Sequence, residues 1–338
     1  MKTTQTLLAI ITTFCLLTGC QSKEKEEPSA NNPKNEKLSR LGQYSADEQW
    51  DKIIEECATD GNNALFMSFR NMAMARKGVL ADQLFRYPQN SAAALMPAWN
   101  SAPEVSALLS DIYFAIGDVA NAQHMAFESL VVTNGMQIQL QTEENPAMLK
   151  RLIQTNLIYG EHRVATKYLK VLQSMGGHDE WCKQYQPFID DDAKVAADPL
   201  LGEKRKCIPT QNYFLQRDTP ETDMMRIAQA NPEPRTAIQY IGSMYLLDRQ
   251  LQRFKLFIEA NYNTPLLPTL PRSFQEAVIA VAEADTAYWR KYGVESATTD
   301  RFNQYRQLLL SNKGNPNISN VMRQRFGDTF WYYLMFKQ

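Results

Sequence analysis

The sequence predicts an all-α fold built from repeated helical hairpins. Apolar residues recur at three- and four-residue steps through most of the chain, which places them on one face of a helix. The alternation of apolar and polar residues that marks a strand is not convincing anywhere. The stretch 101–134 carries both start and stop signals for two short helices. At 44% hydrophobic and 22% charged residues, the composition is that of an ordinary globular protein.

Residues 1–19 are predicted to be a bacterial lipoprotein signal peptide. Lys2 supplies a positive charge, and the run from Leu7 to Leu17 is largely apolar but too short to span a bilayer. It ends in Leu17-Thr18-Gly19-Cys20, which looks like a lipobox, where the cysteine is acylated and becomes the mature N-terminus. We expect acyl chains on Cys20 to anchor the protein to a membrane of the cell envelope, the outer membrane being favoured. An ordinary secretory signal that contains a cysteine is the alternative.

Residues 20–40 are predicted to form a flexible tether behind the lipid anchor. From Gln21 to Arg40 the chain has almost no apolar side chain, so burial cannot offset the entropy lost on ordering. Its root-mean-square span would be about 25 Å, from roughly 5 to 6 Å times the square root of the number of residues. Residues 21–27 are also similar to the acidic export signal of surface lipoproteins of Bacteroidota, so the outer surface and the periplasmic face both stay open.

Residues 41–177 are predicted to form helical repeats, best seen at 101–134. A preceding helix is expected to start near Ser45 or Asp47. In the best repeat, Ser101 is expected to cap the first helix, Gly117 to end it in a left-handed conformation, and Asp118 to cap the second helix. The buried stripe of the first helix is Val105, Leu108, Leu109, Ile112 and Ile116, and that of the second is Ala122, Ala126, Ser129 and Leu130.

This hairpin resembles the tetratricopeptide repeat in its order of large, aromatic, glycine and small residues: Leu109, Tyr113, Gly117, Ala122, Ala126, Ser129 and Leu130. A copy offset by 43 residues begins at the predicted cap Asn145 and contains Leu152, Asn156, Gly160, Ala165, Leu169 and Leu172. A weaker copy has its turn at Gly78, 39 residues before Gly117, with Arg70 and Gln83 out of pattern, and a fourth covers 236–262, with Arg249 at its turn. We therefore expect an α-solenoid with long connections.

Residues 178–234 are predicted to be an irregular connecting region with short helices between two helical halves, because periodicity fades and prolines recur there. The second half, 235–338, is expected to contain one long helix from Arg272 to about Tyr292 and another from Thr299 to Ser311. The aromatic end, 330–336, is too short to span a membrane and is predicted to be a buried closing helix. An exposed docking segment is the alternative.

No residue pattern predicts catalysis, a metal or another cofactor, so we expect a protein that is not an enzyme. The sequence contains no phosphate-binding loop, nucleophile elbow or CxxC pair. His124, His162 and His178 lack metal-ligand spacing and are expected at the surface. The acidic run 190–192, with Asp198 beyond it, lacks the spacing and central glycine of a calcium loop, so a solvated turn is preferred to a calcium site.

The charge and the cysteines set further limits. Without the signal peptide the net charge is 35 minus 37, or minus two, and the mixed cluster at 203–206 is short, so we expect no nucleic-acid partner. Cys57, Cys182 and Cys207 remain beside Cys20. A disulfide between Cys182 and Cys207 would suit an oxidising envelope. Three separate thiols are the preferred interpretation, because sequence does not give the distance between cysteines.

Several stretches together resemble a Bacteroidota family of unknown function, usually met as the soluble helical-repeat part of larger membrane proteins. The residues that carry the resemblance are Asp111-Ile112-Tyr113 through Gly117 to Ala126-Phe127-Glu128, Asn156 to Gly160 with Tyr168-Leu169-Lys170, Asn231-Pro232 with Tyr240 and Leu246-Leu247, and Gly327 to Trp331. The resemblance implies helical packing and carries no catalytic residue. A lipid anchor stands here where multiple membrane helices would be.

Two functions follow as hypotheses. The first is a lipid-anchored scaffold that holds an envelope protein partner, as curved repeat arrays commonly do. The second is a ligand-capture lipoprotein, similar to the starch-binding lipoproteins that pair with outer-membrane transporters. Trp99, Trp181 and Trp289 are spread along the chain, which favours the scaffold. A cluster of exposed tryptophans on one face would favour ligand capture.

Overall fold

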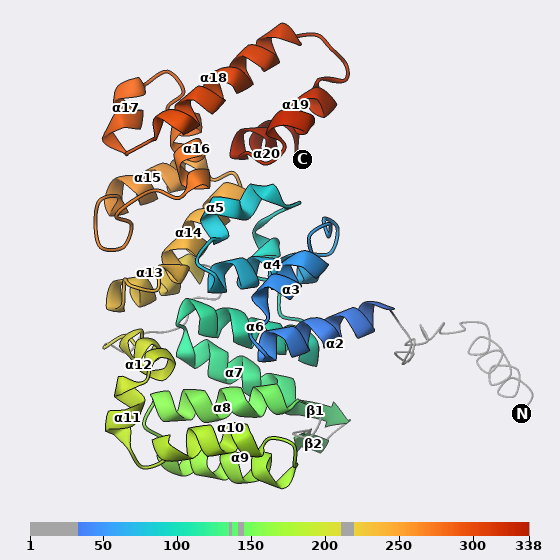
Figure 1. Ribbon diagram of the computed structural model, residues 1–338, viewed down its shortest axis with the longest axis vertical. Coiled ribbons are helices and arrows are strands. Elements are labelled where there is room, and N and C mark those ends of the chain that lie inside the picture. Colours follow the sequence, from blue (N-terminus) through green and yellow to red (C-terminus); the bar gives the residue numbers. More distant parts are fainter. Residues whose placement is uncertain (1–32, 135–136, 141–144, 211–219, 338) are drawn as a thin grey trace, which may run out of the picture. The chain divides into compact units, whose positions relative to one another are not determined.

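A computed structural model describes residues 33–134, 137–140, 145–210 and 220–337, and helices make up nearly all of its regular structure (Figure 1). The predicted all-α class is confirmed. The signal peptide, Cys20 and the tether up to residue 32 lie outside the described residues. The chain divides into compact units at 1–39 and 40–338, and the first is described only at 33–39, within helix α2.

The first group of elements corrects two boundaries. The predicted tether is helical from residue 33 onward, and the next helix starts at Trp50 rather than near Ser45 or Asp47, because Glu48 takes a left-handed φ of 54° between the two helices. Helix α4 is nearly all buried, and its cap Asn63 accepts the N–H of Leu65. The elements are α2 (Pro33–Ala46), α3 (Trp50–Glu56), α4 (Ala64–Arg76), α5 (Leu80–Gln83), η1 (Leu84–Arg86) and η2 (Ala92–Ala94).

Helices α6 (Pro103–Ile116) and α7 (Val119–Leu130) form the predicted central hairpin, with both predicted stripes buried. Gly117 has a φ of 100°, and its N–H reaches the carbonyls of Tyr113 and Phe114. Asp118 accepts the N–H of Asn121 at 3.0 Å. The predicted cap at Ser101 is wrong: Ala102 is the N-cap residue, and Ser101 takes a φ of 66° one residue earlier.

Helices α8 (Pro146–Ile158) and α9 (His162–Ser174) form the second predicted hairpin. Asn145 caps α8 by accepting the N–H of Met148, and Gly160 turns the chain with a φ of 75°. Helices α6, α7, α8 and α9 pack in series, each against the next (Figure 1). Between α7 and α8, strands β1 (Val131–Asn134) and β2 (Gln137–Leu140) form an antiparallel pair that the sequence analysis missed.

The region 178–234 contains short helices whose prolines start them rather than interrupt them. Pro199 and Pro220 stand at first helical positions, where a missing N–H is harmless. Asp191 and Asp198 cap two of these helices by accepting backbone N–H groups. The elements are α10 (Asp179–Tyr185), η3 (Gln186–Phe188), α11 (Asp192–Ala197), α12 (Pro199–Lys206) and α13 (Pro220–Ala230).

The C-terminal elements include the predicted hairpin α14–α15, where Arg249 makes the turn with a φ of 54°. The predicted single helix from Arg272 to Tyr292 is wrong. The chain leaves the helix at Ala282, and Asp285 caps a new helix by accepting the N–H of Tyr288. The elements are α14 (Thr236–Leu247), α15 (Leu251–Asn261), α16 (Arg272–Val281), α17 (Thr286–Lys291), α18 (Ser296–Ser311), α19 (Ile318–Phe326) and α20 (Phe330–Phe336).

Helix α20 is buried over its first four residues, so the aromatic end is a buried helix rather than an exposed segment. It is attached to α16, where Glu276 accepts the N–H of Phe330 through its carboxylate and the indole N–H of Trp331 through its carbonyl. No helix in the described part of the chain is long and apolar enough to cross a membrane.

Segments far apart in sequence meet at α5, which packs against α14 and α16 (Figure 1). Asp82 accepts the N–H of Arg272 at 2.8 Å, and Ser273 donates to the carbonyl of Ala81. The hydroxyl of Tyr333 donates to the carbonyl of Leu247 at 2.7 Å and reaches that of Asn90 at 3.1 Å. The chain around residues 80–90 is therefore packed directly into the C-terminal helices.

Candidate functional site

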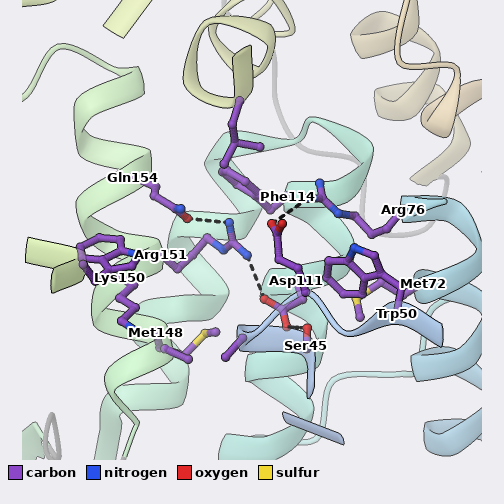
Figure 2. Close-up of a pocket in the computed structure, with 15 residues that line it drawn as sticks. Ser45, Trp50, Met72, Arg76, Asp111, Phe114, Met148, Lys150, Arg151 and Gln154 are labelled. Carbon is purple, nitrogen blue, oxygen red and sulfur yellow. Dashed lines mark hydrogen bonds and ion pairs between the residues drawn. The ribbon is translucent and has the colours of Figure 1, made fainter. Parts of the chain in front are cut away.

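A small polar cavity lies where residues from seven helices and one connection meet, and Figure 2 shows its lining. Its volume is about 80 Å³. Side chains come from the end of α2, from α3, α4, α6, α8 and α10, and from the start of α12. We call it the polar cavity; its lining residues are Ser45, Ala46, Glu48, Trp50, Met72, Arg76, Asp111, Phe114, Ala147, Met148, Lys150, Arg151, Gln154, Trp181 and Leu200.

The centre of the polar cavity is an ion pair between Asp111 on α6 and Arg151 on α8, with Nη2 of the arginine 3.0 Å from the carboxylate (Figure 2). Ser45 donates its hydroxyl to the second carboxylate oxygen at 2.6 Å. The other Nη of Arg151 donates to Gln154 at 2.8 Å, and the guanidinium carbon lies 3.6 Å from the centroid of the Phe114 ring. Burial lowers the pKa of Arg151.

Two further cations stand against tryptophan rings at the edge of the polar cavity. Arg76 pairs with Glu48 at 3.3 Å and lies 5.2 Å from the centroid of Trp50. The ammonium of Lys150 lies 5.6 Å from the ring of Trp181. The site therefore combines fixed positive charge, hydrogen-bond donors and two flat apolar walls, which suits a small anionic group.

A second concave surface is mostly apolar and has a volume of about 460 Å³. Four methionines line it, from the segment after η2, from α7, from α13 and from α14. We call it the methionine groove; its lining residues are Ala92, Ala93, Met96, Pro97, Ala98, Trp99, Leu109, Tyr113, Ile116, Asp118, Asn121, His124, Met125, Pro220, Asp223, Met224 and Met244.

The methionine groove has an exposed aromatic side chain and two buried carboxylates, of which Asp223 is paired with Arg226 at 2.8 Å. Trp99 is 45% exposed, and its indole N–H donates to Ser106 at 3.1 Å, which fixes the ring. The carboxylates of Asp118 and Asp223 are both buried. Burial raises the pKa of Asp118, and the charge of Asp223 adds to this, so the two carboxylates repel each other. An apolar side chain followed by a cation matches this surface.

The family comparison gives a match over almost the whole chain: a model described as a family of unknown function, DUF6057, matches residues 1–337. The chain belongs to the DUF6057 family. This confirms the family-of-unknown-function part of the predicted resemblance and extends it over the N-terminal residues. No curated protein and no solved structure matches the chain.

The cysteines of this DUF6057 chain do not form the disulfide that was considered. Cys182 and Cys207 are separate buried thiols, and Cys57 is buried as well, which confirms the preferred interpretation. Burial raises the pKa of both Cys182 and Cys207. Cys207 packs on the central turn, since a Cβ at Gly117 would lie 2.8 Å from its Sγ.

The predicted polar candidates lie apart and have structural partners. His124 lies 3.2 Å from Glu128, and His162 lies 2.9 Å from Asp192 of the acidic run, while His178 precedes α10. Asp192 also pairs with Arg205 of the mixed cluster at 3.1 Å. Within the described ranges, no three histidine, cysteine or carboxylate side chains gather as a metal site would require.

The tryptophans and the polar pair show what the sequence analysis missed. Trp99 lines the methionine groove, Trp181 lines the polar cavity, and Trp289 is buried. Asp111 and Arg151 were not predicted as site residues. One signal was available, because Gln154 occupies the place of Asp111 in the copy offset by 43 residues, so the two repeats carry a polar residue at the same position.

Proposed function

We propose that this chain is a lipid-anchored cell-envelope protein, attached through Cys20, that acts as a tetratricopeptide-like interaction scaffold. Its partner is a segment of an envelope protein held in the methionine groove. We also propose that residues 1–19 are a bacterial lipoprotein signal peptide, that the protein comes from Bacteroidota, and that it lies at the outer membrane. The proposal holds for the outer surface and for the periplasmic face. The observation that carries it is the methionine groove, with its exposed Trp99.

The repeat interpretation is supported by matched positions in two hairpins. Gly117 and Gly160, 43 residues apart, both turn the chain with positive φ. Ala122 and Ala165 stand at equivalent places and are both fully buried. Since α6 to α9 pack in series, each hairpin covers the apolar stripe of its neighbour, which is what a helical repeat requires.

The binding role is supported by the chemistry of the methionine groove. Methionine is unbranched and polarisable, so it adapts to apolar side chains of different shape, and such surfaces recur where proteins bind varied partners. A fixed, exposed tryptophan is a common energetic centre of interfaces. The buried carboxylate of Asp118 in the groove favours a lysine or arginine beside the apolar anchor, whereas Asp223 is already paired with Arg226. A segment with an aliphatic or aromatic residue next to a basic one fits best.

Site-specific photo-crosslinking in cells tests this proposal. A benzoylphenylalanine at position 99 is expected to crosslink to a second envelope protein, and Met244→Glu, which places a charge in the methionine groove, is expected to abolish that crosslink. The matched control is the same probe at Leu310, which is 66% exposed on α18. Equal crosslinking from both positions would contradict the proposal, and so would crosslinks only to residues 211–219 of the same chain.

The ligand-capture alternative has less support. All tryptophans lie in the described part of the chain, and Trp99 is the one that is exposed, so they form no exposed cluster. The polar cavity, at about 80 Å³, is far below the roughly 300 to 1,000 Å³ of pockets that enclose a drug-sized ligand. A glycan platform beside a transporter is therefore the second candidate.

A further inference from the structure

We infer that the polar cavity binds a small oxyanion, a carboxylate or a phosphate group, between Arg151, Lys150 and Arg76. This site is separate from the methionine groove and does not depend on the proposed scaffold function. The inference rests on an unused buried donor, on an excess of positive charge and on the size of the cavity.

The unused donor is Nε of Arg151. Asp111 and Gln154 occupy the two Nη atoms, whereas Nε is buried without a hydrogen-bond partner. A buried N–H that lacks an acceptor costs roughly 1 to 3 kcal/mol, more when the group is charged. Asp111 has both oxygens engaged, one by Arg151 and one by Ser45. The described part of the chain therefore supplies no acceptor for Nε.

The nearby cations are available to an incoming anion. Lys150 has no carboxylate within ion-pair distance among the described residues, and its ammonium rests on the Trp181 ring. Arg76 is paired with Glu48, whose side chain is 63% exposed. Exposed pairs of this kind contribute little free energy, so Arg76 can exchange Glu48 for a ligand at small cost.

Positive charge is in excess around the polar cavity. Its lining holds the cations Arg76, Lys150 and Arg151 and the carboxylates of Glu48 and Asp111. Behind Phe114 lies the buried Lys204, paired with Glu203 at 2.9 Å. Burial is the main cause of the lowered pKa of both Arg151 and Lys204, and the charge of Arg76 lowers each further. A bound anion relieves this mutual repulsion.

The size selects the ligand class. At about 80 Å³ the cavity is far below the roughly 300 to 1,000 Å³ of pockets that enclose a drug-sized ligand, so a small group such as a carboxylate or a phosphate suits it best. Trp50, labelled in Figure 2, and Trp181 line the same cavity, so the organic part of a carboxylate or phosphate ester can lie against their rings.

Indole NMR of the Cys20→Ser chain tests the inference, because all tryptophans report at once. Sodium acetate and sodium phosphate are titrated against sodium chloride at equal ionic strength. We expect the indole signals of Trp50 and Trp181 to shift saturably with acetate, phosphate or both, while those of Trp289 and Trp331, which are buried elsewhere, stay fixed. Saturation by one salt alone identifies the carboxylate or the phosphate. Shifts no larger than those with chloride would overturn the inference.

Two variants keep the test independent of folding. Lys150→Met removes a half-buried cation that holds no ion pair in the described part, and is expected to weaken anion binding at least tenfold. Lys170→Met, on the exposed face of α9, is the control and should bind as the unaltered chain does. Equal affinity in Lys150→Met and Lys170→Met would overturn the inference.

Discussion

Arg70 is a single residue that joins two loops to a helix. In the sequence it departs from the repeat pattern, yet it is fully buried in α4. Its guanidinium donates to the backbone carbonyls of Cys57 at 2.7 Å, Asp60 at 3.1 Å and Pro88 at 2.5 Å. Burial lowers the pKa of Arg70 to about 10, so it stays charged at neutral pH. The residue is structural: the three carbonyls accept from its two Nη atoms, while its Nε is buried without a hydrogen-bond partner.

We predict that Arg70→Met destabilises the chain by roughly 3 to 5 kcal/mol, because it leaves buried carbonyls without a donor. Urea unfolding of the two proteins measures the difference in the free energy of unfolding. Arg70→Lys should fall between them, since an ammonium keeps the charge but cannot span three carbonyls in the guanidinium geometry. A loss below about 1 kcal/mol in Arg70→Met would contradict this account.

Glu276 is a buried carboxylate that links α16 to α20. It accepts the N–H of Phe330 at 2.7 Å and pairs with Arg272 at 2.9 Å. Burial raises its pKa from 4.5 to about 7, against the opposing effect of Arg272. The folded chain therefore holds a proton at Glu276 over a pH range in which the unfolded chain has lost it.

The sign of the resulting pH dependence follows from linkage. Between about pH 4.5 and 7 the folded state binds the additional proton, so this residue makes the chain less stable as pH rises through that window. The full effect is on the order of 3 kcal/mol, at about 1.4 kcal/mol for each pKa unit. We predict that Glu276→Gln removes this fall between pH 5 and 8, as measured by urea unfolding at each pH.

Glu283→Gln is the control for that measurement, because Glu283 is largely exposed and should leave the pH profile as it is. If Glu276→Gln lost stability with rising pH as steeply as the unaltered chain, the assignment to Glu276 would be wrong.

At the scale of elements, Gly242 of α14 lies directly against the ring of Phe274 of α16. A Cβ there would lie 2.2 Å from Cζ of Phe274, a fully buried ring. Alanine suits an α-helix better than glycine by about 1 kcal/mol, but overpacking a core costs typically 1 to 3 kcal/mol. Because the contact is with a ring that has no space to move into, the packing effect should be the larger one.

We predict that Gly242→Ala lowers the melting temperature, while Gly42→Ala, in α2 with no atom within 4 Å of its added Cβ, raises it or leaves it unchanged. Thermal unfolding followed by circular dichroism compares both variants with the unaltered chain. A stabilised Gly242→Ala would show that α14 and α16 separate easily at this point.

The elements also show which predictions sequence supports. Helices with a stripe and a clear stop, such as α6 with Gly117 and α8 with Gly160, were placed nearly to the residue. The break at Ala282 was missed because an apolar pattern continues through it while Asp285, a cap, resembles an ordinary exposed residue. Strands β1 and β2 have four residues each, too few for periodicity to separate them from a loop.

At the scale of the whole molecule, the site was largely beyond sequence reasoning. The polar cavity draws residues from Ser45 to Leu200, and only the packing of α2, α4, α6 and α8 brings them together. Asp111 and Arg151, forty residues apart, carry no local signal of their ion pair. The four methionines of the methionine groove lie on different elements and carry no local signal of a shared surface either. The buried face of a helix and its capping residues can be predicted from the sequence, because both are local. Concave surfaces cannot, because they depend on contacts between distant segments.

The predicted anchor is tested on the whole cell. With Cys20 intact, we expect the protein to sediment with membranes, because acyl chains hold it there. Cys20→Ser should be released from the membrane. External protease on intact cells then decides the face: cleavage places the chain outside, and protection until the outer membrane is opened places it in the periplasm. A Cys20→Ser protein that still sediments with membranes would refute lipid anchoring through this residue.

The reaction rates of the three buried thiols can be used to measure local opening of the chain. Cys57, Cys182 and Cys207 end or belong to three different helices, and each is at most 1% exposed. An alkylating reagent can reach each sulfur only when its surroundings part, so the three labelling rates report separately on α3, α10 and the contact of α12 with the central turn. If an anion bound in the polar cavity makes α10 open less often, the labelling rate of Cys182 decreases while that of Cys57 does not change. Mass spectrometry of labelled peptides then follows motion in this protein without any added probe.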